Sequence, residues 1–152
     1  MLVVEDIFQL KQHIGRELGP SDWLLVTQHQ IDVFAELTQD RHWIHIDQDR
    51  ARSEMPSGKT VAHGLLTLSL MPRLADTLLS VRRYRRGLNY GCNRVRFTAP
   101  VHPGSRIRLR QTIKDVIDID GGVRMTLHNV LESDGHPDRP AMVAETVIQM
   151  YD

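Results

Sequence analysis

The chain has 152 residues, of which 41% are hydrophobic and 25% are charged. This composition is typical of one globular domain over residues 1–152, long enough to bury a core without disulfides or a structural metal. The single cysteine, Cys92, excludes an intrachain disulfide and favours a reducing compartment. The acidic N-terminal segment lacks the order of a signal peptide, and no apolar run reaches the roughly 20 residues that span a bilayer. We therefore expect a cytoplasmic protein without membrane attachment.

The charge is balanced overall but uneven along the chain. Residues 82–110 contain nine arginines and no acidic side chain. This segment opens with an arginine block, defined here as Arg82, Arg83, Arg85 and Arg86. The block can be a solvated basic face, or it can bind an anionic partner that carries phosphates. Nucleic acid is the weaker candidate partner, because the whole chain is not basic and few aromatic residues accompany the arginines.

The first elements in chain order are short. Residues 5–18 predict a helix that the Gly19-Pro20 pair ends. Residues 23–26 predict a brief extended segment.

A second helix follows over residues 28–38. Thr27 and Gln30 have the spacing of a capping box, and apolar side chains recur behind them at helical intervals. Residues 39–56 are mostly polar and predict a structured loop.

The most hydrophobic segment, residues 62–79, is apolar nearly all round. This pattern predicts a buried helix roughly 27 Å long. Pro72 lacks a backbone N–H, so we expect a kink there or a break into two shorter helices.

After about residue 86 the pattern changes to the alternation of β-strands. Four segments alternate in this way: residues 94–98, 106–110, 123–128 and 142–150. Asp120-Gly121-Gly122 predicts a hairpin turn between two of them. Helices followed by about four antiparallel strands predict the α+β class, with a sheet covering the buried helix.

A polar cluster lies between the second and third predicted helices. Asp40 and His45, five residues apart across a loop, can converge on one water molecule and exchange protons with it near pH 7. Trp43 and Ile44 would anchor this loop. The alternative is that Asp40 and Asp47 are caps and that His45 is a hydrogen-bonded, half-buried histidine.

A second cluster, residues 58–64, lies at the entrance to the buried helix. The first N–H groups of a helix lack partners, and Gly64 would let a substrate carbonyl approach the backbone closely. The alternative is that Gly58 and Gly64 serve only a turn and tight packing.

Two other chemistries fit less well. His45 and Asp47, with His63 or His128, have the residue types of a facial metal triad, but these residues lie between helices rather than in a barrel. Cys92 has no neighbour that would activate it except arginines. We therefore expect no metal site and no nucleophilic cysteine.

Taken together, these motifs resemble the MaoC-like hydratase family and its NodN-like branch, from about Trp23 to the C-terminus. The matching motifs are Asp40, Trp43-Ile44-His45, Asp47, Ala62-His63-Gly64, Leu66-Thr67-Leu68-Ser69-Leu70, Asn89-Tyr90-Gly91, Val95-Arg96-Phe97 and Pro100-Val101. The resemblance implies a hot-dog fold, in which an antiparallel sheet wraps a long central helix. It also implies a homodimer that joins its sheets edge to edge, with no cofactor.

The resemblance implies an (R)-specific enoyl-CoA hydratase, which adds water reversibly to trans-2-enoyl-CoA. Asp40 and His45 would hold the water, in roles that the sequence does not assign, and the Gly64 N–H would polarise the thioester carbonyl. His63 would lie in the substrate site, and the arginine block would bind the phosphates of coenzyme A.

Three positions depart from the family pattern. His42 stands where many relatives have an asparagine that assists the reaction, and Ser57 replaces an aromatic residue of the acyl pocket wall. Gln39 replaces a common glycine beside Asp40. These departures leave the acyl chain length open, as well as the carrier of the acyl group, which is coenzyme A or a carrier protein.

Two rival functions remain at this point. One is a hot-dog acyl-CoA thioesterase, and the other is a non-catalytic module that binds acyl-CoA or lipid.

Overall fold

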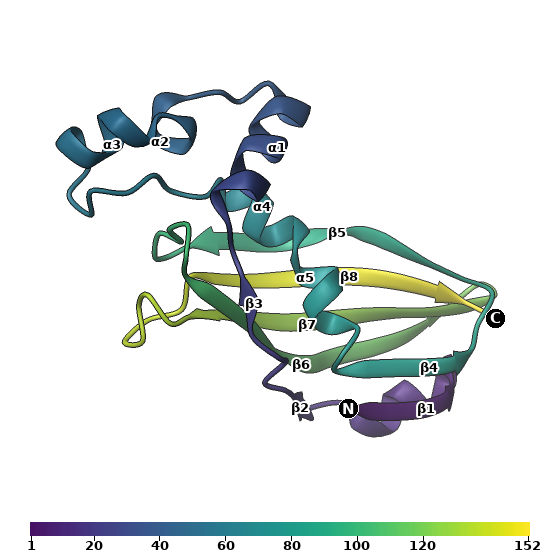
Figure 1. The fold of residues 1–152 in the computed structure, drawn as a ribbon. Coiled ribbons are helices and arrows are strands. Elements are labelled where there is room, and N and C mark those ends of the chain that lie inside the picture. Colours follow the sequence, from purple (N-terminus) through teal and green to yellow (C-terminus); the bar gives the residue numbers. More distant parts are fainter.

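The computed structural model describes all 152 residues and is built around an antiparallel sheet (Figure 1). Two short strands pair with one edge strand of this sheet, β6. The six strands are β2 (Glu17–Leu18), β3 (Leu24–Leu25), β5 (Arg86–Phe97), β6 (Arg106–Ile119), β7 (Gly122–Ser133) and β8 (Met142–Tyr151). The long strands follow the order β6-β7-β8-β5, which leaves β5 at the other edge. The predicted four strands and the turn at Asp120-Gly121 are confirmed.

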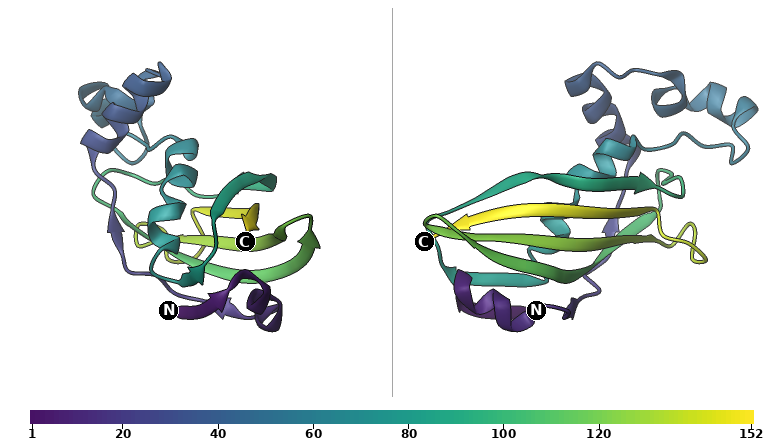
Figure 2. Two further views of the ribbon diagram at one scale, coloured as in Figure 1. Left: turned by 90° about the vertical axis from the view of Figure 1, so that its right-hand side faces the viewer. Right: turned by 180° about the vertical axis from the view of Figure 1, so that it is seen from behind.

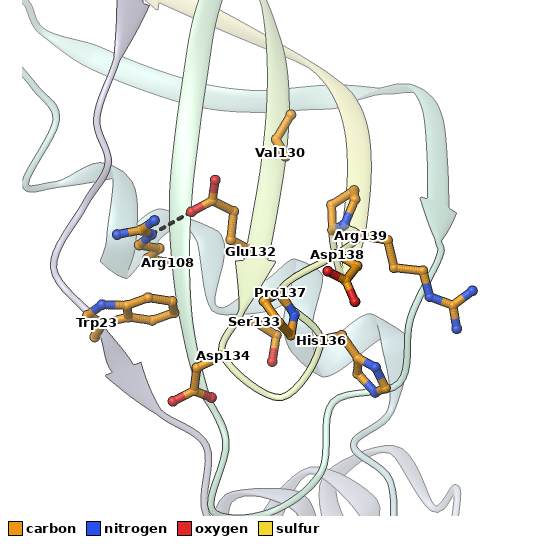
Figure 3. Close-up of a pocket in the computed structure, with 11 residues that line it drawn as sticks. Trp23, Arg108, Val130, Glu132, Ser133, Asp134, His136, Pro137, Asp138 and Arg139 are labelled. Carbon is orange, nitrogen blue, oxygen red and sulfur yellow. Dashed lines mark hydrogen bonds and ion pairs between the residues drawn. The ribbon is translucent and has the colours of Figure 1, made fainter.

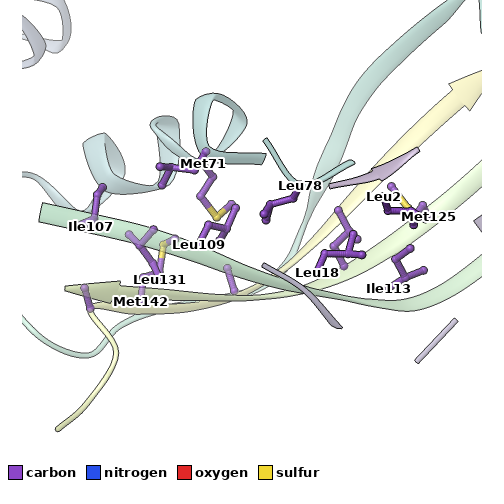
Figure 4. Packing of buried hydrophobic residues seen from close by; sticks show 14 of the residues in the cluster. Leu2, Leu18, Met71, Leu78, Ile107, Leu109, Ile113, Met125, Leu131 and Met142 are labelled. Atoms are coloured by element: carbon purple, nitrogen blue, oxygen red, sulfur yellow. The ribbon is translucent and has the colours of Figure 1, made fainter. Parts of the chain in front are cut away.

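One face of the sheet is apolar and the other is charged. Ile107, Leu109 and Ile113 alternate along β6 and are fully buried in the core (Figure 4). The intervening side chains point outward, where Arg108 forms an ion pair with Glu132 of β7. This alternation follows from the two-residue period of a strand and fixes the face on which the helices pack.

The helical segment on the apolar face consists of α4 (Gly64–Ser69) and α5 (Met71–Ala75). The break predicted at Pro72 is confirmed, but the helix predicted over residues 62–79 is shorter than expected. The two helices together extend over roughly 18 Å, and they meet at Leu70. Pro72 lies in the first turn of α5, where its missing N–H costs no hydrogen bond, so a new helix begins just before it.

The helix predicted over residues 5–18 is wrong at both ends. The chain begins as β1 (Leu2–Asp6), which pairs in parallel with β4 (Leu79–Arg83). A 3₁₀ helix, η1 (Ile7–His13), follows because the Asp6 carboxylate accepts hydrogen bonds from two backbone N–H groups of its first turn.

Three helices form a lobe beyond one end of the sheet (Figure 2). They are α1 (Gln28–Thr38), α2 (Trp43–Ile46) and α3 (Gln48–Glu54). The helix predicted over residues 28–38 is confirmed, whereas the loop predicted over residues 39–56 contains α2 and α3. Asp47 begins α3 as its N-cap. No helix of the chain combines the length and the hydrophobicity that crossing a membrane requires.

Both ends of α1 are fixed by local features of the sequence. The Thr27 hydroxyl accepts a hydrogen bond from the Gln30 N–H, and the Gln30 side chain accepts one from the Thr27 N–H. The helix ends at Gln39, whose φ of 61° is left-handed. Gln39 therefore adopts the conformation that glycine usually supplies at a helix end, and the turn into Asp40 is kept.

We expect Thr27→Ala to lower the free energy of unfolding by about 1 kcal/mol, because α1 loses one half of its capping box. Chemical denaturation measures this change. Thr27→Ser keeps the hydroxyl and serves as the control. Equal stability of the two variants would contradict the role of the cap.

Candidate active site

Three side chains from different elements meet where the helical lobe joins the sheet. Asp40 follows the end of α1, His45 belongs to α2, and His63 directly precedes α4. Their potential ligand atoms all lie within 4.8 Å of one another. The rings of His45 and His63 stack with centroids 3.7 Å apart. The structure therefore brings Asp40 and His45 together, as the sequence predicted, and adds His63 to them.

The hydrogen bond of His45 to the backbone fixes the tautomer of its ring. Its Nδ1 lies 2.6 Å from the Val61 carbonyl oxygen, which can only accept, so Nδ1 carries the hydrogen. The Val61 N–H in turn donates to the Ile44 carbonyl at 2.9 Å, which ties α2 to the segment before α4. In the neutral ring, Nε2 is therefore left with a lone pair.

The pKa of His45 is lowered from its ordinary value of 6.5. Partial burial is the largest cause, because it disfavours the charged imidazolium, and the neighbouring His63 acts in the same direction. The Val61 carbonyl and the Asp40 carboxylate oppose this shift. His45 is thus a neutral base at pH 7.

Gln28, at the start of α1, stabilises the position of His45 through its backbone carbonyl. Its Nε2 donates to the His45 carbonyl at 2.8 Å, and its Oε1 accepts from the Thr60 hydroxyl. The sequence analysis did not identify Gln28, and it placed Thr60 in the cluster of residues 58–64 without a role of its own. No local pattern marks them, because their partners lie 17 and 32 residues away.

His63 is 4% exposed and contacts protein on all sides. Its Nε2 donates to the Asp40 backbone carbonyl at 2.9 Å, and its ring packs against Phe34. Its Nδ1 is buried without a partner. His63, which the sequence predicted in the substrate site, therefore lies within this cluster with its ring buried, bonded to the Asp40 backbone and stacked on His45.

Gly64 provides a free backbone donor next to this cluster. Its N–H begins α4 and makes no hydrogen bond within the chain. A Cβ at this position would lie 2.6 Å from the ring of Phe97, so a larger residue would require that ring to move. A cavity of about 250 Å³ opens here, between Gly64, Thr67, Phe97 and the segment 98–101.

Two residues predicted to bind substrate lie outside the cluster. His42 is exposed at the start of α2, with its ring 6.0 Å from that of Trp43. Ser57 is exposed in the loop before α4, where its hydroxyl bonds only to the backbone of Lys59.

The arginine block lies at the opposite end of the sheet, where β4 ends and β5 begins (Figure 1). The 12 residues of β5 span roughly 40 Å between this block and Phe97. Arg82 pairs with Glu5 and Arg83 lies 3.8 Å from Asp6. Within one chain the block is therefore not beside the Asp40–His45 pair.

The facial triad considered from the sequence is not assembled. Asp47 caps α3, and His128 is exposed on the outer face of β7. In the cluster that does form, each histidine already donates one ring N–H to a backbone carbonyl.

Another hollow, of about 420 Å³, lies on the outer side of the sheet beside the β7–β8 loop (Figure 3). Trp23 forms one wall, with the Arg108 guanidinium 4.5 Å from its ring. The Arg108–Glu132 ion pair crosses its floor. Arg108 and Glu132 pair with each other there, and the hollow brings together no convergent carboxylate and imidazole like those of Asp40 and His45.

We expect nuclear magnetic resonance to give a titration midpoint below 6.5 for His45, with the hydrogen of the neutral ring on Nδ1. Because the pKa of His45 is lower in the folded state, the unfolded state binds this proton more readily. The free energy of unfolding therefore decreases as the pH falls below 6.5. His45→Gln assigns the signal. A midpoint above 6.5, or a hydrogen on Nε2, would contradict this geometry.

Comparison with known proteins identifies the family. The family model described as "MaoC like domain" matches residues 9–134. Over 98% of both chains, the protein is 39% identical to 3-hydroxyacyl-thioester dehydratase Z of Mycobacterium tuberculosis. It is 41% identical to nodulation protein N of Rhizobium leguminosarum, over 90% of this chain and 86% of that one.

Solved structures agree with the fold. A monoamine oxidase regulatory protein from Archaeoglobus fulgius superposes with a TM-score of 0.77 at 21% identity, over 99% of this chain and 95% of that one. An (R)-hydratase from A. caviae involved in PHA biosynthesis gives 0.70 at 18% identity, over 89% and 94%. The fold is the hot-dog fold, with a broken rather than a long central helix. The chain belongs to the MaoC-like dehydratase family.

Proposed function

We propose that the protein is an (R)-specific enoyl-CoA hydratase, which adds water reversibly to trans-2-enoyl-CoA to give (R)-3-hydroxyacyl-CoA. The observation that carries this proposal is the convergence of the Asp40 carboxylate with a neutral His45 whose Nε2 is free to accept a proton. The names of two similar proteins, a 3-hydroxyacyl-thioester dehydratase and an (R)-hydratase, support the same reaction class.

The two side chains can hold one water molecule, because each offers a hydrogen-bond acceptor to one of its hydrogens. His45 takes a proton from the water while the oxygen bonds to C3 of the substrate. The imidazolium, stabilised by Asp40, then gives that proton to C2. One group thus accepts and returns the same proton, so the addition needs no second acid.

The charge that develops on the thioester oxygen needs a donor. The Gly64 N–H has no partner in the chain and can supply it. One well-placed donor of this kind lowers a barrier by roughly 3–4 kcal/mol. Binding at Gly64 also leaves the acyl chain free to follow α4 and α5 along the apolar face of the sheet.

The two alternative functions, a thioesterase and a binding module, predict different changes in the acyl-CoA. A thioesterase would direct the same water at the carbonyl carbon and free a thiol from saturated acyl-CoA. A binding module would bind acyl-CoA and leave the enoyl absorbance unchanged. A converging acid and neutral base favour the hydratase over the binding module, and the relative's dehydratase name favours it over the thioesterase.

We expect Asp40→Asn and His45→Gln each to reduce the hydration of crotonyl-CoA at least 100-fold, because each removes one acceptor from the water. Loss of enoyl absorbance reports the rate. Asp22→Asn and His29→Gln make the same chemical changes at exposed positions without side-chain hydrogen bonds, and they should retain activity. Wild-type rates in both site variants would refute the assignment.

We further propose a homodimer that pairs along β5. The outer edge of β5 is unpaired, and its large side chains Leu88, Tyr90 and Phe97 are 49%, 60% and 47% exposed. An unpaired, partly apolar edge strand favours association with another strand. A twofold axis near the middle of β5 makes the pairing antiparallel, so the start of one strand faces the end of the other.

This pairing would bring the arginine block of one copy to the Gly64 end of the other. The charges suit it, because residues 28–54 carry six acidic and three basic side chains at that end. Arg85 and Arg86 have no carboxylate partner within the chain. We propose that they bind the phosphates of coenzyme A held in the other copy's site.

Mixed dimers test this arrangement. One copy carries Asp40→Asn and the other carries Arg85→Gln with Arg86→Gln. If the block acts on the other copy's site, each mixed dimer contains one intact site, and mixing restores about half of the activity per dimer at low enoyl-CoA concentration.

The unmixed arginine variant should show a KM for enoyl-CoA about ten-fold higher, with little change for the shorter enoyl-pantetheine. Mixing without any recovery would refute the exchange between copies.

A further inference from the structure

A row of polar side chains crosses the apolar face of the sheet, one from each long strand. It consists of Gln111, Asn129, Thr146 and Cys92. Their register places Gln111 opposite Asn129, and Thr146 opposite Cys92. The neighbouring positions on this face are aliphatic and form the core. Burying an amide among aliphatic side chains destabilises the folded state unless the amide is hydrogen-bonded, so the partners of these polar groups are informative.

Asn129 is satisfied entirely within the chain and fixes the orientation of its neighbours. Its Nδ2 donates to the carbonyls of Leu127 and Ala144 and to the Thr146 hydroxyl oxygen. Its Oδ1 is therefore turned toward Gln111, which must present its NH₂ group, at 2.8 Å. The orientation of the Gln111 amide follows from Asn129.

This arrangement leaves the Gln111 carbonyl oxygen without a donor and the Thr146 hydroxyl hydrogen without an acceptor, and the second amide hydrogen of Gln111 is also unused. The Oε1 of Gln111 accepts no hydrogen bond within the chain and remains accessible to solvent, although the residue as a whole is only 5% exposed. The Thr146 oxygen accepts from Asn129, so its own hydrogen remains free to donate. Gln111 and Thr146 bond to Asn129 from the two strands that flank β7, and both line the same cavity, so together they offer an acceptor and a donor to a ligand hydroxyl group.

Both residues line a cavity of about 530 Å³ between the sheet and the helices. Its helical wall runs from Leu68 to Ala75, which lie roughly 6 to 17 Å beyond Gly64 along the helix axis. Gln111 also lines a smaller cavity of about 190 Å³ next to it, so it stands at the junction of the two. A ligand group there would lie several carbons from a thioester held at Gly64.

We propose that the protein selects acyl thioesters that carry a hydroxyl group on the distal part of the acyl chain, recognised by Gln111 Oε1 and the Thr146 hydroxyl. The proposal rests on the proposed function for the position of the thioester. It adds a substrate class that the catalytic cluster does not define. A plain alkyl chain would leave the Gln111 carbonyl desolvated and unpaired, so it should bind less well than its hydroxylated counterpart.

Calorimetry with saturated acyl-CoA tests the selection without any turnover. The probes are six-, eight- and ten-carbon chains, each with and without a terminal hydroxyl. We expect at least one hydroxylated chain to bind the wild-type protein about five-fold more tightly than its plain counterpart.

Gln111→Leu should abolish or reverse this preference. Because that variant also leaves the Asn129 carbonyl unpaired, Thr146→Val provides a milder test: the Asn129 amide keeps two backbone acceptors when the hydroxyl is removed. Thr146→Val should lose the preference, and Thr146→Ser, which restores the hydroxyl, should regain it.

Equal or weaker binding of every hydroxylated chain by the wild-type protein would overturn the inference, as would a preference that survives in both Gln111→Leu and Thr146→Val. Hydration of crotonyl-CoA is measured alongside. A protein that prefers hydroxylated chains but does not hydrate crotonyl-CoA overturns the proposed function and retains the selection. A protein that hydrates crotonyl-CoA but shows no preference for hydroxylated chains retains the proposed function and overturns the selection.

Discussion

The chemistry of the site depends on the hydrogen bond from His45 Nδ1 to the Val61 carbonyl. A carbonyl accepts and cannot donate, so this contact fixes the imidazole hydrogen on Nδ1 and leaves the lone pair on Nε2. The same segment receives the Ile44 contact from α2 and leads directly into α4. One short extended stretch before the helix therefore orients the base and places the Gly64 amide. Because both come from the same backbone, a shift of one would shift the other.

The broken helix has a consequence for the site as well as for the fold. The interruption of the helix at Leu70 lets α4 and α5 each bury apolar side chains against a curved sheet. Leu66 comes from α4, and Met71 and Leu74 come from α5. A straight helix would contact a curved surface over a shorter length. The remaining space on the β5 side becomes the cavity of about 530 Å³, whose helical wall begins at Leu68, roughly 6 Å beyond Gly64. The proposed acyl groove is thus the part of the concave face that two short helices do not cover.

The sequence predicted the features that depend on neighbouring residues and missed those that depend on distant ones. The capping box of Thr27 and Gln30, the break near Pro72 and the hairpin at Gly121 are local, and all three are confirmed. β1 was missed, and its last two residues were placed in a helix, because its strand conformation comes from pairing with β4, 77 residues away. Gln28 and the role of Thr60 were missed for the same reason. The Asp40–His45 pair was identified because both residues lie in one motif, whereas the position of the arginine block depends on the path of β5.

The unpaired edge of β5 belongs both to the proposed dimer interface and to the proposed groove for the acyl chain. Asn89, Gly91 and Cys92 belong to that edge strand, and all three also line the cavity of about 530 Å³ that contains Gln111 and Thr146. A second copy paired along β5 would therefore close the open side of the groove and exclude water from Gln111 and Thr146. Hydrogen bonds in such a closed groove are stronger than in one that is open to solvent, because water no longer competes for the same groups. Selection among acyl chains and formation of the dimer would then be one linked equilibrium, since anything that binds only the closed groove also stabilises the dimer.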